Sequence, residues 1–379
     1  MDAKFIRNVL LKALALFVAA NLIFAAWNPA PSNPGGITGL LGHISAYNLL
    51  FPGRERFPFG ENPAKSYNLS LYSLPAMFAS LEINAAAKPS GEYRVVLVGD
   101  SSVWGTLLRP EQTLAGQLNA AHLATCGGLQ LRAFNLGYPT LSLTKDLMVL
   151  DQVPRYHPDL IVWLTTLDSF PRVNQLTSPI VSNNPDVVAG LAARYKIQFD
   201  PRDPALVYTS WWGRTIIGQR RPLADLLRLQ FYGVLWAATG IDQEYPTNYE
   251  KAQRALDADV TYHGWKPPVM PPDGLAFDVL DAGMNAAGPT PVLLVNEPIL
   301  VSTGKNSDLR YNFFYPRWAY DQYRQLLAGH SQQKGWNYLD VWNLVQEGEF
   351  TNTAIHLSPA GEALLTQRLG AAILQQACH

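Results

Sequence analysis

The sequence predicts an α/β fold: a three-layer αβα domain around an open, parallel five-stranded sheet, with a membrane-spanning N-terminal helix and a large insertion. Five short runs of consecutive apolar residues indicate the strands, because strands covered on both faces of a parallel sheet are apolar throughout. Helix-like stretches lie between these runs, an alternation typical of an open α/β sheet. The predicted strands are residues 93–98, 131–136, 160–164, 291–295 and 336–341, and the predicted helices are residues 110–123, 143–153, 315–327 and 359–374.

Composition restricts the kinds of function that the chain can have. With 29 Lys and Arg against 30 Asp and Glu, the net charge is −1, and only 16% of the residues are charged. This balance argues against a nucleic-acid-binding protein. Hydrophobic residues make up 48% of the 379 residues, which is enough for at least one large core, so a disordered chain is not expected.

The two cysteines, Cys126 and Cys378, exclude a disulfide-rich scaffold and a Cys-x-x-Cys metal or redox site. Their large separation in the sequence gives no sign that they are neighbours in the fold. We therefore favour two free, buried thiols, and a single bridge in an exported protein is the alternative.

The N-terminus predicts a membrane anchor over residues 1–27. Residues 9–27 are apolar except for Lys12 and Asn21, and two basic residues precede them. A helix over residues 5–27 would be roughly 34 Å long, enough to cross a bilayer core. Because positive flanks stay cytoplasmic, we expect a single-pass membrane protein whose C-terminal domain is extracytoplasmic. A cleaved signal peptide is the alternative, and it would export the remainder as well.

The rest of the chain divides into two predicted regions. Residues 28–90 are rich in Pro, Gly, Asn and aromatic residues, which predicts an irregular collar near the membrane. Residues 91–379 form the α/β domain, with an insertion over residues 171–289 that interrupts the alternation of strands and helices. Within the insertion, residues 222–239 are strongly apolar. A buried core helix is the favoured interpretation of this stretch, and contact with lipid or with a partner helix is the alternative.

Residues that follow the predicted strands are the candidates for a functional site, because ligands bind beyond the carboxyl ends of parallel strands. The first strand runs into the sequence Gly-Asp-Ser-Ser, residues 99–102. A serine in a sharp turn between a strand and a helix exposes its hydroxyl, which suits Ser101 as a nucleophile. The same residues would also serve as a plain helix cap.

A second motif follows the last predicted strand, where AIHLSPAG contains His356 and opens the final helix. Together with RVVLVGDSSVWG, FNLGYPT and PDLIVWLTTLDSF, this motif resembles the blocks of the SGNH (GDSL) hydrolase superfamily, in the family's order. The resemblance covers residues 93–170 and 290–374, and the first and last blocks are the more specific ones. It implies a flavodoxin-like sheet and ester chemistry.

The resemblance implies that Ser101 attacks an ester carbonyl while His356 accepts its proton. It also implies an oxyanion hole made by the backbone N–H groups of Ser101 and Gly137 and by an Asn side chain of the third block. No cofactor is implied. Five further histidines have no paired spacing and predict no metal site; these are His43, His122, His157, His263 and His330.

The oxyanion position departs from the family pattern, because Asp168 stands where the family has its Asn donor. An ionised carboxylate cannot donate a hydrogen bond, and it would repel the developing negative charge. The hole therefore needs either a protonated Asp168 or a hydroxyl from Thr165 or Thr166.

The residue that orients the histidine departs as well, because Thr353 stands where the family has an Asp. Asn352 can accept a hydrogen bond from the ring and fix its tautomer, but it stabilises the imidazolium less than a carboxylate does. Asp340, at the end of the fifth strand, is a second candidate for this role, and a structural cap is the other interpretation of it.

Two further groups have a functional and a structural interpretation. Glu297 follows the fourth strand, where it would bind a substrate hydroxyl or cap a loop. An aromatic and cationic cluster at helical spacing would stack on sugar rings or pack in the core, and core packing is favoured. Its members are Arg310, Tyr311, Arg317, Trp318, Tyr320 and Tyr323.

These features lead to one predicted function and two alternatives. The prediction is an exported, membrane-anchored serine esterase or O-acyltransferase that acts on acyl esters of cell-envelope glycans, a substrate class implied by anchored relatives in the superfamily. The expected partners are the lipid bilayer, an integral-membrane protein and a polysaccharide, and no nucleic acid. One alternative is a catalytically degenerate subunit of a membrane complex. The other is a lipase or thioesterase acting on membrane acyl chains.

Overall fold

The computed structural model describes residues 2–27, 46–51, 74–79, 81–84, 86–240 and 249–378. Most of the predicted collar, together with His43, lies outside these residues. The chain forms two compact units. The first comprises residues 1–82, 179–194 and 198–240, and the second comprises residues 83–178, 195–197 and 241–379.

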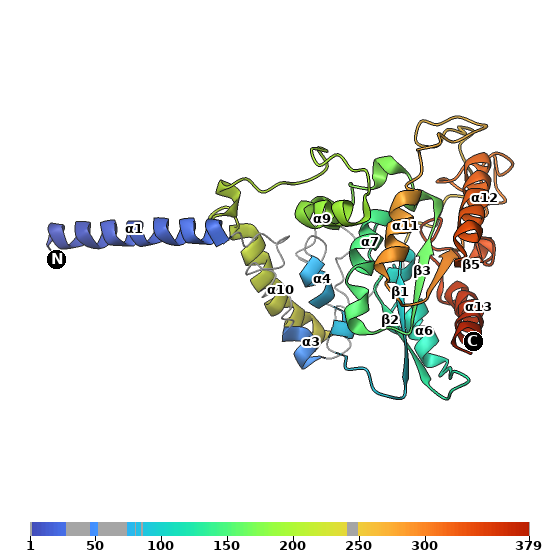
Figure 1. The fold of residues 1–379 in the computed structure, drawn as a ribbon, viewed down its shortest axis with the longest axis horizontal. Helices are drawn as coiled ribbons and strands as arrows, with labels where there is room; N and C mark the ends of the chain where they lie inside the picture. Colours follow the sequence, from blue (N-terminus) through green and yellow to red (C-terminus); the bar gives the residue numbers. More distant parts are fainter. Residues whose placement is uncertain are drawn as a thin grey trace. The chain divides into compact units, whose positions relative to one another are not determined.

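The second unit contains a five-stranded, fully parallel sheet, which confirms the predicted fold class (Figure 1). The strand order is β2-β1-β3-β4-β5, the flavodoxin-like order. Every strand begins and ends within one residue of its predicted run. The strands are β1 Glu92–Val98, β2 Gln130–Asn135, β3 Leu160–Thr165, β4 Val292–Asn296 and β5 Asn337–Asp340.

Helices cover both faces of this sheet (Figure 1). On one face, α6 and α13 bury their apolar side chains against inward-facing residues of β1 to β4. On the other face, α11 packs so closely over Trp163 of β3 that a side chain at Gly283 would lie 2.4 Å from the indole ring. Two tyrosines of α12, Tyr320 and Tyr323, donate from the same face to Asn296 at the end of β4.

The helices of the second unit differ in detail from the predicted stretches. The predicted stretch 110–123 contains a 3₁₀ turn before its α-helix, and the stretch 143–153 ends in a second 3₁₀ turn. The α-helices are α5 Ser101–Trp104, α6 Leu114–Ala120, α7 Leu143–Leu150, α11 Phe277–Ala286, α12 Arg317–Lys334 and α13 Pro359–Ala377. The 3₁₀ helices are η3 Pro110–Gln112, η4 Val153–Tyr156, η5 Leu167–Ser169, η6 Arg172–Asn174 and η9 Glu347–Glu349.

The predicted insertion, residues 171–289, is shared between the two units. Residues 179–194 and 198–240 belong to the first unit, whereas α11 is one of the helices that cover the sheet. The apolar face of α11 and the bulk of Trp163 explain why this helix stays with the sheet.

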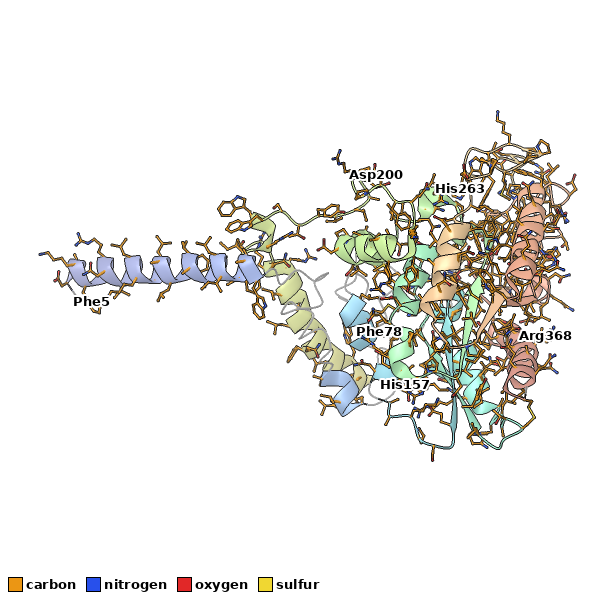
Figure 2. The ribbon with its side chains drawn as sticks, in the orientation of Figure 1. Phe5, Phe78, His157, Asp200, His263 and Arg368 are labelled. Carbon is orange, nitrogen blue, oxygen red and sulfur yellow. A yellow bond between two sulfur atoms is a disulfide. The ribbon has the colours of Figure 1, made fainter. Side chains whose placement is uncertain are left out.

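The first unit contains the N-terminal helix and most of the insertion's helices. Its elements are α1 Ala3–Trp27, α3 Ala46–Leu50, α4 Leu74–Ala79, η2 Glu82–Asn84, α8 Pro179–Ser182, α9 Pro185–Tyr195, η7 Trp212–Arg214 and α10 Arg220–Thr239; η2 and α9 each end in the second unit. Among the described residues, α1 is the one helix long and apolar enough to cross a membrane. Most of its side chains point outward, as Figure 2 shows for Phe5.

Helix α10 differs from the favoured interpretation of residues 222–239 as a buried core helix. Leu227, Phe231 and Leu235 recur every four residues along it, and all three side chains are exposed. The helix therefore presents an apolar stripe on its outer face.

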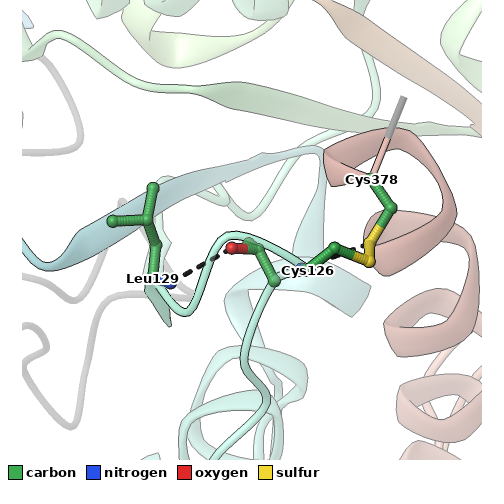
Figure 3. Close-up of a disulfide and its surroundings, with 4 residues drawn as sticks. Cys126, Leu129 and Cys378 are labelled. Atoms are coloured by element: carbon green, nitrogen blue, oxygen red, sulfur yellow. Dashed lines mark hydrogen bonds between the residues drawn. A yellow bond between two sulfur atoms is a disulfide. The ribbon is translucent and has the colours of Figure 1, made fainter.

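A disulfide joins Cys126 to Cys378, with the two Cα atoms 5.3 Å apart (Figure 3). The preference for two free thiols was therefore wrong. The long α13 runs across the sheet and ends beside the turn that precedes β2, which brings together two residues separated by 252 positions.

Candidate active site

Ser101, His356 and Asn352 meet beyond the carboxyl end of β1. The Nε2 atom of His356 lies 2.7 Å from the Ser101 Oγ, and its Nδ1 atom lies 2.8 Å from the Asn352 Oδ1. An amide oxygen only accepts hydrogen bonds, so Nδ1 carries the ring proton. The lone pair of Nε2 then faces the serine hydroxyl, which is the arrangement of a nucleophile with its general base.

Burial sets the protonation state of this histidine. The His356 side chain is 7% exposed, and desolvation lowers its pKa from 6.5 to about 4. The imidazole is therefore neutral at neutral pH and free to accept a proton. Asn352 orients the ring but adds no negative charge that would restore the basicity of the imidazole.

The turn that presents Ser101 is built from small residues and a cap. A side chain at Gly99 would lie 2.5 Å from Val103, so only glycine fits where β1 turns into α5. Asp100 caps α5 by accepting a hydrogen bond of 2.8 Å from the Ser102 N–H. Gly105 ends this one-turn helix with φ of 83°, a conformation that favours glycine.

A buried acid pair lies directly behind the nucleophile. Glu297 is 1% exposed and accepts a hydrogen bond from the Ser102 hydroxyl. Desolvation, followed by the charge of Asp100, raises the pKa of Glu297 well above its usual value, and desolvation also raises the pKa of Asp100. Each carboxyl keeps one buried oxygen without a hydrogen-bond partner. The carboxylate charge of Asp100 disfavours ionisation of Glu297, because two buried carboxylates side by side would repel each other.

The position of Glu297 bears on its predicted role. The residue does lie at the end of β4, but its carboxyl group points into the protein interior. There it lines a cavity of about 10 Å³ together with Ser102 and Glu362. This placement argues for holding the Ser101 turn in position and against contact with a substrate hydroxyl.

Lys145 provides the positive charge of this buried network. Its ammonium group is fully buried, donates to the Gly99 carbonyl at 2.6 Å and pairs with Asp146 at 2.5 Å. Its charge is also one of the influences that oppose the rise in the pKa of Asp100. Lys145 thus anchors the end of β1 from α7.

The Gly137 N–H already has a partner. It donates to the Asn135 Oδ1 at 2.9 Å, while the Asn135 side-chain amide donates to the Val103 carbonyl. A side chain at Gly137 would lie 2.3 Å from the Trp104 nitrogen, so glycine is required by this close approach. The Gly137 N–H would reach an oxyanion only by sharing or leaving its bond to Asn135.

Asp168 is engaged by residues from the predicted insertion. Its Oδ1 atom accepts a hydrogen bond from the Tyr262 hydroxyl at 3.2 Å and lies 2.8 Å from the His263 Nε2 (Figure 2 labels His263). The hydroxyls of Thr165 and Thr166 are also engaged, with the Val295 carbonyl and the Tyr315 hydroxyl respectively. Neither threonine thus offers a free hydroxyl in place of the missing Asn.

Several other predicted candidates have structural roles. Asp340 pairs with Arg324 at 2.7 Å and accepts a hydrogen bond from Asn296, so it does not orient His356. In the aromatic and cationic cluster, Tyr311, Tyr320 and Tyr323 are buried, as expected for core packing. The described residues hold no group of three or more His, Cys, Asp or Glu that would bind a metal ion.

Comparisons with known proteins found no matching family model and no match among curated proteins. Among solved structures, the chain is similar to Est24, a carbohydrate acetylesterase from Sinorhizobium meliloti, with 12% identity and a TM-score of 0.34 over 75% of this chain and 99% of that chain. It is also similar to the aryl esterase of M. smegmatis, with 12% identity and a TM-score of 0.34 over 74% and 98% of the two chains. The activities in these names are those of the named proteins.

Proposed function

We propose that this protein carries out serine-dependent acyl ester chemistry at Ser101, as an esterase or an O-acyltransferase. The observation that carries the proposal is the hydrogen-bonded series from the Ser101 hydroxyl through His356 to Asn352, with distances of 2.7 and 2.8 Å. A serine hydroxyl is a weak nucleophile until a positioned base accepts its proton, and the neutral His356 is such a base.

The proposed reaction has two halves. In the first, the Ser101 Oγ bonds to the ester carbonyl carbon while its proton moves to the Nε2 atom of His356. The intermediate then breaks its bond to the alcohol oxygen, and His356 returns the proton to the departing alcohol. In the second half, water or an acceptor hydroxyl attacks the acyl-serine with the same help from His356. Water gives an esterase, and a sugar hydroxyl gives an acyltransferase.

The site is incomplete in the donors that would stabilise the negative charge of the oxyanion during this reaction. The backbone N–H of Ser101 makes no hydrogen bond within the described part of the chain, so it is the oxyanion donor we propose. Gly137 would join it after releasing Asn135, and Asp168 would join it only when protonated. Loss of one such donor typically slows the chemical step by about 10²- to 10³-fold.

We further propose that the protein is exported and held in the membrane by α1, where it acts on acyl esters of cell-envelope glycans. The length and hydropathy of α1 support an anchor. The disulfide supports an extracytoplasmic α/β unit, because such bonds persist in oxidising compartments. The glycan substrate rests on the resemblance to the SGNH superfamily alone.

A catalytically degenerate subunit of a membrane complex is the second candidate. The hydrogen bonds already made by Gly137 and Asp168 favour it, because two of the three predicted oxyanion donors are engaged elsewhere. Such a subunit would keep the fold and bind its partner without turning over an ester.

Release of acetate from an O-acetylated glycan by the full-length protein tests the proposal. We expect Ser101→Ala to abolish release, or transfer of the acetyl group to an acceptor glycan, while the protein remains folded by circular dichroism. Ser331→Ala is the matched control, because this buried α12 hydroxyl has no hydrogen-bond partner. An inactive wild-type protein that retains a membrane partner regardless of Ser101→Ala would favour the degenerate subunit.

A further inference from the structure

An exposed aromatic and basic segment borders the end of α1 within the first unit (Figure 1). This border segment, residues 207–221, includes η7 and the start of α10. Trp211 is 45% exposed, Trp212 is 72% exposed and Ile217 is 52% exposed. Large apolar side chains of a water-soluble surface are seldom gathered in this way, so the segment is a candidate contact surface.

The border segment packs on one stripe of α1. Most side chains of α1 are exposed, but Asn21 and Ala25, one turn apart, are buried. The Ile217 N–H donates to the Asn21 Oδ1 at 3.3 Å, and the Asn21 amide donates to the Phe17 carbonyl at 2.9 Å. A polar side chain within an apolar helix is costly in lipid unless it is hydrogen-bonded, so the border segment supplies what Asn21 needs there.

This contact fixes the depth of the border segment relative to α1. Asn21 lies six residues before Trp27, the last residue of the helix, which corresponds to roughly 9 Å along the axis. A helix that crosses a bilayer with Trp27 at its interface places this level just below the headgroups, in the outer part of the acyl chains. Whatever packs against Asn21 from outside the helix must therefore enter the same layer.

The chemistry of the border segment fits that layer. Between residues 204 and 224 the sequence has three arginines and no acidic residue. Trp211 and Trp212 pack edge to face at 4.9 Å, and indole rings with a polar N–H favour the membrane interface. The exposed stripe of α10, which contains Leu227, Phe231 and Leu235, continues the apolar surface. Basic and aromatic amphipathic elements of this kind lie in the plane of the interface.

We propose that the border segment and the outer stripe of α10 are a second membrane contact, seated in the bilayer surface beside the end of α1. Trp211 and Trp212 lie at the level of the headgroups, and Arg214 and Arg220 lie beside lipid phosphates. The inference rests on the proposed membrane span of α1. Lipid is the occupant that the observations favour over a partner helix, because the surface is continuous with α1 and residues 204–224 carry three arginines and no acidic residue.

Tryptophan quenching in lipid nanodiscs tests this contact. The full-length protein, which has ten tryptophans, is reconstituted with lipids whose acyl chains carry bromine, a quencher that acts only on rings in contact with lipid. Four of these tryptophans, Trp27, Trp211, Trp212 and the half-buried Trp236 of α10, are expected to reach lipid. The double variant Trp211→Phe with Trp212→Phe should therefore lose about half of the quenched emission. The matched control Trp336→Phe, in the α/β unit, should lose none.

Failure of this inference can be told apart from failure of the anchor. If Trp27→Phe lowers the quenched emission and the double variant does not, α1 lies in the membrane and the border segment does not. A protein partner that covers the border segment in the cell would give this result. If neither variant lowers the quenched emission, the membrane span of α1 is wrong, and the inference falls with it.

Discussion

The residues around the proposed base and the residues around the proposed oxyanion hole differ in the hydrogen bonds that they make. On the base side, Ser101, His356 and Asn352 already make the hydrogen bonds that ester chemistry needs. On the oxyanion side, the Gly137 N–H and the Asp168 carboxyl are engaged by other residues of the protein. The contrast shows that the proposed nucleophile and base are assembled, while two of the three groups proposed to stabilise the oxyanion are bound to other residues.

The largest effect should come from the base side. Replacing His356 with Gln keeps a polar side chain but removes the base, so we expect kcat to fall on the order of 10³-fold. Ester hydrolysis by the purified protein measures this loss. His330→Gln is the matched control, because His330 pairs with Asp281 on α11, outside the site. If His356→Gln and His330→Gln have equal activities, His356 is not the catalytic base.

A gain is expected on the oxyanion side. Asp168→Asn replaces a carboxylate with an amide that can donate a hydrogen bond to the oxyanion, and its oxygen can still accept from Tyr262. We expect kcat to rise on the order of 10- to 10²-fold, since one donor is worth about that much or more. Asp281→Asn, at another Asp and His pair, should leave kcat unchanged. An unchanged or lower kcat for Asp168→Asn would show that residue 168 does not face the oxyanion.

The pH dependence of kcat/KM tests the contact between Asn352 and the His356 ring. Burial holds the pKa of His356 at about 4, so kcat/KM should fall only as the pH drops toward that value and the imidazole becomes protonated. Asn352→Asp places a negative charge beside the ring, which favours the imidazolium and should move the acid limb upward by about one pH unit or more. Asn285→Asp, on the exposed side of α11, is the control. An acid limb that stays in place would contradict the contact between Asn352 and His356.

The smallest effect concerns the acid pair behind Ser101. The pKa of Glu297 is raised in the folded protein, so between its unfolded and folded values the folded state holds the extra proton. The free energy of unfolding should therefore decline as the pH rises above about 4.5, the ordinary value for Glu. Glu297→Gln, which still accepts from Ser102, should make this decline shallower in urea unfolding measured across pH, and the buried Glu362, whose pKa is raised to about 8, should keep part of it. The exposed Glu111→Gln should keep it.

Much of the second unit follows from sequence because its physical signals are local. Continuous apolar runs identify strands that are covered on both faces, and each run was placed within one residue. The turn before Ser101 stands out for the same reason, because it immediately follows a strand with clear boundaries, whereas the role predicted for His356 comes from the resemblance to the SGNH superfamily.

The remaining features depend on contacts between distant residues. The partners of Asp168, Tyr262 and His263, lie in a part of the insertion with no periodic pattern. The approach of Glu297 to Ser102 depends on the register of β4 beside β3, and the disulfide depends on the length of α13. One local signal was available and overlooked: Asn135 lies two residues before Gly137, close enough for its side chain to occupy the Gly137 N–H.

Labelling with a fluorophosphonate probe tests the central claim most directly, because the probe forms a covalent bond only with a serine that a neighbouring base activates. Peptide mass spectrometry of the labelled full-length protein should place the adduct on Ser101, and labelling should be lost in Ser101→Ala and in His356→Gln but kept in Ser331→Ala. A folded wild-type protein that takes up no probe, or one whose labelling survives Ser101→Ala, would contradict the account.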